Sequence, residues 1–99
     1  MKLQIQNKLG TFEVKGSFTL ENTKKVKDHF DHLLDQYEEV VMCLKKVNTI
    51  DKSALQVLIY LHQKACRRSK ILFVLGKGNR TVVNALKKNQ LTYIFRNDY

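Results

Sequence analysis

The sequence is poor in the residues and patterns that mark linkers, disulfide scaffolds and membrane spans. Its 99 residues include no proline, four glycines and two cysteines. No low-complexity tract divides the chain, so we expect one domain over residues 1–99. No apolar run approaches the ~18–20 residues of a membrane helix, and residues 1–10 lack the apolar core of a secretory signal. Cys43 and Cys66 are expected to stay reduced, as in a cytoplasmic protein.

Acidic residues are also scarce relative to basic ones. Nine Asp and Glu face 18 Lys and Arg, for a formal net charge of +9. This excess raises the alternative of a nucleic-acid or anionic-lipid binder. Lys64, Arg67, Arg68, Lys87 and Lys88, however, fall in the predicted last turns of two helices, where cations complement the helix dipole. The aromatic residues do not interleave with basic ones, which argues against nucleic acid.

Apolar periodicity predicts the strands. Residues 3–6 and 12–15 alternate around a turn at 7–10, as in a hairpin with one buried face. The apolar runs at 40–44 and 71–75 are continuous, which is typical of parallel strands buried on both faces.

Spacing of three and four residues predicts three helices. The first carries an apolar stripe from Val26 to Tyr37, with Asn22 as its N-cap; the second runs from about Ser53 to Arg68. Asn79 is expected to cap the third, and Asn89 to end it in a left-handed conformation. The fold class expected is α/β: a mixed sheet of four to five strands with an N-terminal hairpin and three main helices.

The most informative stretch joins the first buried strand to the second helix. We expect a loop over residues 46–50, then Asp51 and the start of the helix. Carboxyl ends of strands are where open α/β sheets form binding sites. Asp51 is a candidate cap, and Ser53-Ala54-Leu55-Gln56 also fits the S-x-x-Q capping box, in which Ser53 would stabilise the helix by ~1 kcal/mol.

Residues 50–55, I-D-K-S-A-L, resemble the D-S-S-G-L signature of the STAS family, which includes anti-sigma factor antagonists and the tails of sulfate transporters. Residues 16–19 resemble the family's G-x-L-D turn after the second strand. Residues 79–95 resemble its last helix and its ending. The resemblance covers most of the chain, and the matching segments follow one another in the same order as in the family. It implies a STAS-like single domain.

In that family the second serine of the signature can be phosphorylated by an anti-sigma factor that is also a serine kinase. The unphosphorylated form binds this partner, which has a histidine-kinase-like ATPase fold, and so releases a sigma factor. The resemblance therefore implies Ser53 as the phosphorylation site. A phosphate there would sit in the first turn of a helix, where unpaired N–H groups favour it, and would add about −1.5 to −2 charges. The partner-binding residues it implies are Asp51, Lys52, Ser53, Ala54, Thr19 and Asn48.

The chain departs from the family pattern at four positions. Lys52 replaces the first serine, Ala54 the glycine, Thr19 an acid, and Cys43 an Asp or Asn of the buried strand. These departures keep a second reading open: a non-phosphorylated scaffold, or an accessory subunit beside a transporter ATPase. Whether Ser53 is a phosphoacceptor or a helix cap also stays open.

Other constellations point to neither metal nor cofactor. His29 and His32 share a face with Asp28, Asp31 and Asp35, but alternating charges without a further ligand cluster indicate a solvated face. Residues 76–81, G-K-G-N-R-T, lack the phosphate-loop pattern and predict a turn with an N-cap. No nucleophile and base are arranged as in an enzyme, so we expect a binding protein.

Overall fold

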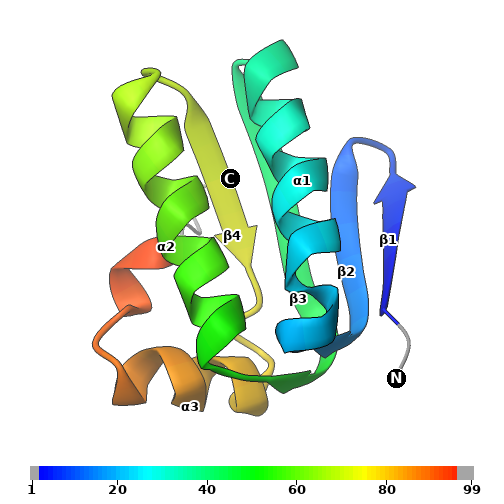
Figure 1. The fold of residues 1–99 in the computed structure, drawn as a ribbon, viewed down its shortest axis with the longest axis vertical. Coiled ribbons are helices and arrows are strands. Elements are labelled where there is room, and N and C mark those ends of the chain that lie inside the picture. The colour runs from blue at the N-terminus through cyan, green and yellow to red at the C-terminus, as the bar shows by residue number, and fades with distance from the viewer. Residues whose placement is uncertain (1–2, 96–99) are drawn as a thin grey trace.

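The structure is a computed structural model that describes residues 3–95 and consists of a four-stranded sheet with helices against one face (Figure 1). In chain order the elements are β1 (Leu3–Lys8), β2 (Thr11–Phe18), α1 (Leu20–Gln36), β3 (Glu39–Ile50), α2 (Lys52–Arg67), β4 (Ile71–Leu75), α3 (Arg80–Lys88) and the 3-10 turn η1 (Thr92–Ile94). The predicted α/β class, hairpin and three helices are confirmed.

The strand order is β1-β2-β3-β4, with β1 antiparallel to β2 and the other two pairs parallel. The parallel pairs are joined through α1 and α2, which lie side by side on the same face of the sheet (Figure 1). Because β2, β3 and β4 run in one direction, their carboxyl ends meet at one edge, and α1, α2 and α3 all begin there. The β1–β2 turn lies at the opposite end (Figure 1).

The expected loop over residues 46–50 is wrong, because β3 continues to Ile50. Its last residues pair with the end of β2, where Gly16 lies opposite Val47 and Phe18 opposite Ile50. Two register irregularities interrupt this pairing. Lys45, Lys46, Asn48 and Thr49 are exposed, and their polarity hid the strand from the apolar pattern. The extended β3 carries the chain to Asp51 at the sheet edge.

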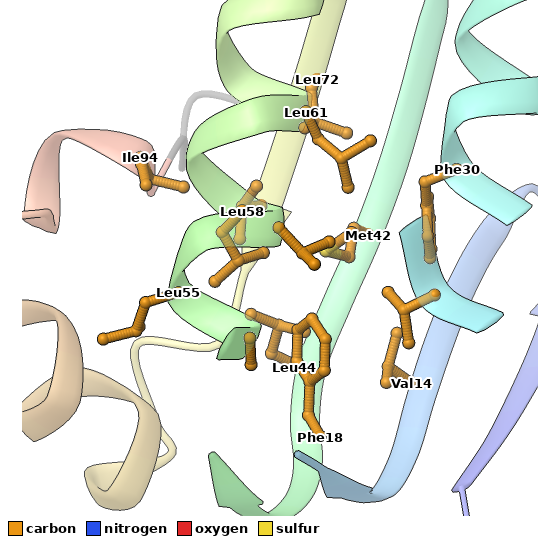
Figure 2. Packing of buried hydrophobic residues seen from close by; sticks show 14 of the residues in the cluster. Val14, Phe18, Phe30, Met42, Leu44, Leu55, Leu58, Leu61, Leu72 and Ile94 are labelled. Atoms are coloured by element: carbon orange, nitrogen blue, oxygen red, sulfur yellow. The ribbon is translucent and has the colours of Figure 1, made fainter. Parts of the chain in front are cut away.

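Apolar side chains from both helices meet those of the sheet in one core. Figure 2 shows Phe30 of α1 and Leu58 of α2 facing Met42 of β3, and all three side chains are fully buried. Leu91 and Ile94 are also buried, so the segment after α3 returns to the core as expected. It does so as a 3-10 turn.

Three predicted helix ends differ in the structure. α1 begins at Leu20, so Asn22 lies inside its first turn and donates from Nδ2 to the Ser17 carbonyl at 2.8 Å. Tyr37 follows α1 and is 54% exposed, so it is not part of the apolar stripe. At the end of α3 the left-handed residue is Gln90, with φ 58°, and Asn89 has φ −107°.

A buried lysine joins α1 to α2. Lys64 is 6% exposed, and its Nζ lies 2.6 Å from Asp31 Oδ1 and 2.8 Å from Asp35 Oδ1. The Tyr60 hydroxyl donates to Asp31 Oδ1 at 2.8 Å. Hydrogen bonds to Asp31 and then Asp35 raise the pKa of Lys64, and the same lysine lowers the pKa of both carboxyl groups. Lys64 is thus an interhelix contact as well as a dipole partner, and these two acids do not belong to a fully solvated face.

The β1–β2 turn contains an unusual residue. Leu9 and Gly10 form its centre with φ 52° and φ 91°, and the Gly10 N–H donates to Asn7 Oδ1 at 3.0 Å. Positive φ at both central positions is the pattern of the type I′ hairpin turn, which favours Asn-Gly. A non-glycine side chain such as that of Leu9 costs about 1–2 kcal/mol in this conformation. Leu9 is also fully exposed, so packing does not offset the cost.

Candidate functional site

Two helices begin at the carboxyl edge of the sheet beside one aspartate. β2 ends at Phe18, which pairs with Ile50 at the end of β3. The next residues, Thr19 and Asp51, therefore leave the sheet side by side as the N-caps of α1 and α2. This brings together residues that are far apart in the sequence.

The Asp51 carboxylate caps both helices. Its Oδ1 accepts from the Ala54 N–H at 3.1 Å, and its Oδ2 accepts from the Leu20 N–H at 2.9 Å. The Thr19 side chain makes no cap hydrogen bond, although Thr19 is the N-cap residue of α1. A negative charge at two helix N-termini is stabilised by both dipoles. The expectation that Asp51 is a cap is confirmed, and its bond to α1 was not foreseen.

Ser53 is not the cap of α2. It occupies the second helical position, and the capping box with Gln56 is absent because Asp51 holds the N-cap place. Ser53 is half-buried, and no hydrogen bond of its hydroxyl is found within residues 3–95. The capping interpretation is therefore wrong.

The other two residues of the turn differ in what they contribute. Ala54 is fully buried and donates its N–H to Asp51. Its helical position does not require glycine, and alanine has the highest helix propensity. Lys52 is exposed at the first helical position. A cation there opposes the helix dipole, so Lys52 is not explained by the stability of α2.

Two further predicted site residues lie at different distances from the turn. Thr19 adjoins the Asp51 carboxylate through its neighbour Leu20. Asn48 is exposed within β3, three residues before Asp51. It lies next to Val47, whose carbonyl accepts from Asn79 Nδ2 at 2.8 Å. Asn48 thus adjoins a residue that is bonded to the start of α3, and no hydrogen bond joins its side chain to Ser53 within the described chain.

An open groove begins at the turn and passes between α2 and α3. Its first part has a volume of about 480 Å³ and its second about 310 Å³, and both parts are lined by Lys52, Leu55 and Asn89. The remaining lining residues are Ile50, Asp51, Ala85 and Lys88 in the first part, and Gln56, Ile59 and Leu91 in the second. The lining is mixed: the apolar residues Ile50, Leu55, Ile59, Ala85 and Leu91 alternate with polar ones, which include two lysines and Asp51. The apolar pattern predicted Leu55, Ile59, Ala85 and Leu91 as core and did not reveal the groove.

An exposed leucine flanks the turn. Leu20 is 70% exposed although its backbone N–H is bonded to Asp51. Solitary exposed leucines are ordinary on protein surfaces, but this one adjoins Lys52 and the groove through Asp51. A leucine directly after a buried strand end is the only sequence signal that could have revealed it.

Asn79 fixes α3 against β3. Its Oδ1 accepts from the N–H groups of Thr81 and Val82, and its Nδ2 donates to the carbonyls of Leu44, Lys45 and Val47 at 2.8–3.2 Å. The predicted N-cap is confirmed. The additional bonds satisfy carbonyls where β3 is irregular, so the G-K-G-N loop has a structural function. Within residues 3–95, no group of His, Cys, Asp or Glu could hold a metal ion, and no helix is long and apolar enough to span a membrane.

Comparison with known proteins gives one family. A family model described as the STAS domain matches residues 1–97. No protein with a curated description matches the sequence.

Solved structures share the fold at low identity. The crystal structure of an anti-sigma factor antagonist from Mycobacterium paratuberculosis superposes with a TM-score of 0.72 at 13% identity, over 95% of this chain and 81% of that chain. The structure of the anti-sigma factor antagonist SpoIIAA in its unphosphorylated form superposes with a TM-score of 0.74 at 10% identity, and the match covers 99% of this chain and 89% of that chain. A crystal structure from Thermotoga maritima superposes with a TM-score of 0.70 at 20% identity, and the match covers 95% of this chain and 83% of that chain.

Proposed function

This chain belongs to the STAS domain family, and from that premise we propose that it is an anti-sigma factor antagonist. It binds an anti-sigma factor of the serine-kinase class, with a histidine-kinase-like ATPase fold, through the turn at Asp51–Ala54, and phosphorylation of Ser53 switches this binding. The single observation that carries the proposal is that Asp51, and not Ser53, caps α2. The serine is thereby left at a helix start, and its hydroxyl makes no hydrogen bond to residues 3–95.

The surroundings of Ser53 suit a protein partner. Leu20 on one side and the α2–α3 groove on the other provide apolar contact area. Lys52 and Lys88 give the rim of the groove a positive charge. Interfaces combine an apolar centre with a polar rim, and opposite charges guide the encounter. The expected partner surface is therefore apolar and acidic.

A phosphate on Ser53 would change this surface without changing the fold. The group would stand beside the Asp51 carboxylate, which already occupies the N–H groups of Ala54 and Leu20. Its charge of about −1.5 to −2 would more than cancel the single positive charge of Lys52. An acidic partner that is attracted to the unmodified turn would then be repelled, because like charges across an interface weaken binding.

Co-expression with the anti-sigma factor kinase of the same genome tests the modification. We expect intact mass to show one added phosphate on the wild type and none on Ser53→Ala. Binding of the purified kinase is then measured for Ser53→Asp, which should weaken affinity at least about tenfold, as expected for a central interface position. Ser69→Asp is the matched control, since Ser69 is exposed beyond the far end of α2.

The outcomes separate the proposed switch from the alternative function. Equal phosphate on wild type and Ser53→Ala would exclude Ser53 as the acceptor. Unchanged binding by Ser53→Asp would exclude the switch and favour the non-phosphorylated scaffold or transporter accessory subunit, which Lys52, Ala54, Thr19 and Cys43 suggest. Absence of binding by the wild type would refute the anti-sigma factor partner itself.

A further inference from the structure

The end of the molecule opposite the Asp51 turn carries a protruding leucine beside a hollow. Leu9, at the tip of the β1–β2 hairpin, is fully exposed in a left-handed conformation that favours other residues. The adjacent hollow is lined by Asn7, Gly10, Phe12, Tyr37, Glu39 and Val40. Strain that local packing does not explain is a reason to look for function. Here the strained residue and the hollow share the same turn.

The size of the hollow indicates what it can hold. Its volume is about 240 Å³, whereas sites for small molecules usually have ≈ 300–1,000 Å³. The hollow is therefore small for a cofactor and suits a single inserted side chain. Phe12 and Val40 give it apolar walls, and Tyr37, which is 54% exposed, adds an aromatic ring with a polar end. Aromatic residues at such positions are typical of interface centres.

Charges of opposite sign flank the protrusion and the hollow. Lys8 precedes Leu9, and its side chain is 51% exposed. Its Nζ lies 3.5 Å from Glu13 Oε1, an oxygen that it shares with Lys15 and Lys46 at 3.9 and 4.0 Å, so Lys8 can approach a second carboxylate while Glu13 keeps two cations. Glu39 lines the hollow and follows Glu38, and both glutamates are exposed. A surface that carries a protruding leucine beside a basic residue, and an apolar hollow beside acidic residues, is complementary to itself.

We propose that this end of the molecule is a self-association surface, on which Leu9 of each copy inserts into the hollow of the other. Such a contact is isologous: one surface meets its own copy across a two-fold axis, and each contact occurs twice. Lys8 of one copy then approaches Glu39 of the other. The proposal is independent of the switch at Ser53.

The contact is small and leaves the other end of the molecule available. Two inserted leucines and their rims bury less than the about 1,200 Å² of a standard interface, so dimerisation is expected to be weak and dependent on concentration. The start of α2, which Asp51 caps, lies at the end of the molecule remote from the β1–β2 turn (Figure 1). A dimer therefore presents two partner-binding turns, and a partner with two sites would gain avidity from it.

Sedimentation velocity of the full chain between about 10 μM and 1 mM, a range set by the expected weakness of a small contact, tests the proposal. The wild type should shift from monomer to dimer across this range. Leu9→Asn should raise the dissociation constant at least about tenfold, and should also raise the melting temperature, because asparagine tolerates the left-handed conformation better. A general loss of fold would also weaken dimerisation, but it would lower the melting temperature. Leu20→Ser is the matched control, since it removes the exposed leucine at the other end, and it should dimerise as the wild type does.

Each other outcome overturns the proposal. A wild type that stays monomeric throughout, or a Leu9→Asn variant that dimerises equally well, removes the surface. Glu39→Lys should weaken association, and stronger association would contradict the charge pairing. Vesicles of phosphatidylglycerol provide the last arm: Leu9-dependent co-sedimentation with them, together with a monomer in solution, would reassign the leucine to a membrane surface.

Discussion

Removal of the Asp51 carboxylate should loosen two helices at once. In Asp51→Ala, the N–H groups of Ala54 and Leu20 lose their acceptors, which lie 3.1 and 2.9 Å away. Loss of an N-cap costs about 1 kcal/mol, and loss of a charge at each helix dipole costs roughly 0.3–1 kcal/mol. Since both bonds are partly accessible to water, the lower part of the combined range applies. We expect the free energy of unfolding to fall by about 2 kcal/mol.

Asp51→Asn should lower the free energy of unfolding by less than Asp51→Ala does. The amide keeps one oxygen, which can accept from Ala54 or from Leu20, while its nitrogen can accept from neither. The expected loss is about 1 kcal/mol. Urea denaturation followed by circular dichroism measures both variants. For a domain of this size the melting temperature should fall by about 4–8 °C per kcal/mol.

Thr19→Ala is the decisive control. Position and residue type make Thr19 look like the cap of α1, but its side chain makes no cap bond. The variant should therefore change stability by less than about 0.5 kcal/mol. Hydrogen exchange of the Leu20 amide adds a local test, because it should accelerate in Asp51→Ala and not in Thr19→Ala. The reverse result, with Thr19→Ala costly and Asp51→Ala neutral, would refute the double cap.

Two other sites give separate predictions. Lys64→Met should lower the free energy of unfolding by about 1–2 kcal/mol, less than for a fully buried pair because Asp31 is partly solvated. Because the pKa of Lys64 is raised, the stability that its charge contributes is complete below the ordinary value of 10.5 and is lost as the pH rises through the raised pKa. Because the pKa of Asp31 is lowered, the stability that its charge contributes is complete above 3.8 and is lost as the pH falls through the lowered pKa. Denaturation from pH 2 to 7 should thus show the gap between wild type and Lys64→Met closing below about pH 4, and a constant gap would contradict the ion pair. Asn79→Ala should lower the free energy of unfolding by about 2 kcal/mol, because it removes the cap of α3 and the bonds to three carbonyls of β3. Asn84→Ala, at an exposed position of the same helix, should change it hardly at all. Equal urea midpoints for these two variants would contradict the role of Asn79 in fixing α3.

Local patterns predicted the elements because each is encoded within one segment. Alternation at residues 3–15 specified the hairpin, and the apolar run at 71–75 became β4 with the expected bounds. The strand over residues 46–50 was missed because its polar side chains face solvent. Its identity depends on pairing with β2, and no local signal encodes a partner strand.

Contacts between distant residues account for what was missed at the site. Asp51 and Leu20 are 31 residues apart, and Lys64 and Asp31 are 33 apart. Each residue alone has an ordinary local explanation, as a cap or as a charge on a helix. Only the parallel order of β2 and β3 shows that two caps emerge at neighbouring points. The groove between α2 and α3 has the same origin, since its apolar lining residues appear as core in the sequence.

The structure divides the residues of the turn into those that the fold requires and those that it does not. Asp51 and Ala54 are explained by the start of α2: one accepts the N–H that the other donates. The fold gives no such reason for Lys52, which opposes a helix dipole, for Leu20, which is 70% exposed, or for Ser53, whose hydroxyl makes no hydrogen bond to the described residues. Selection for stability alone would favour an acid at the first position and a smaller exposed side chain beside it. Lys52 and Ser53 follow Asp51 in α2, and Leu20 is joined to Asp51 by a hydrogen bond, so a partner is expected to bind around this carboxylate.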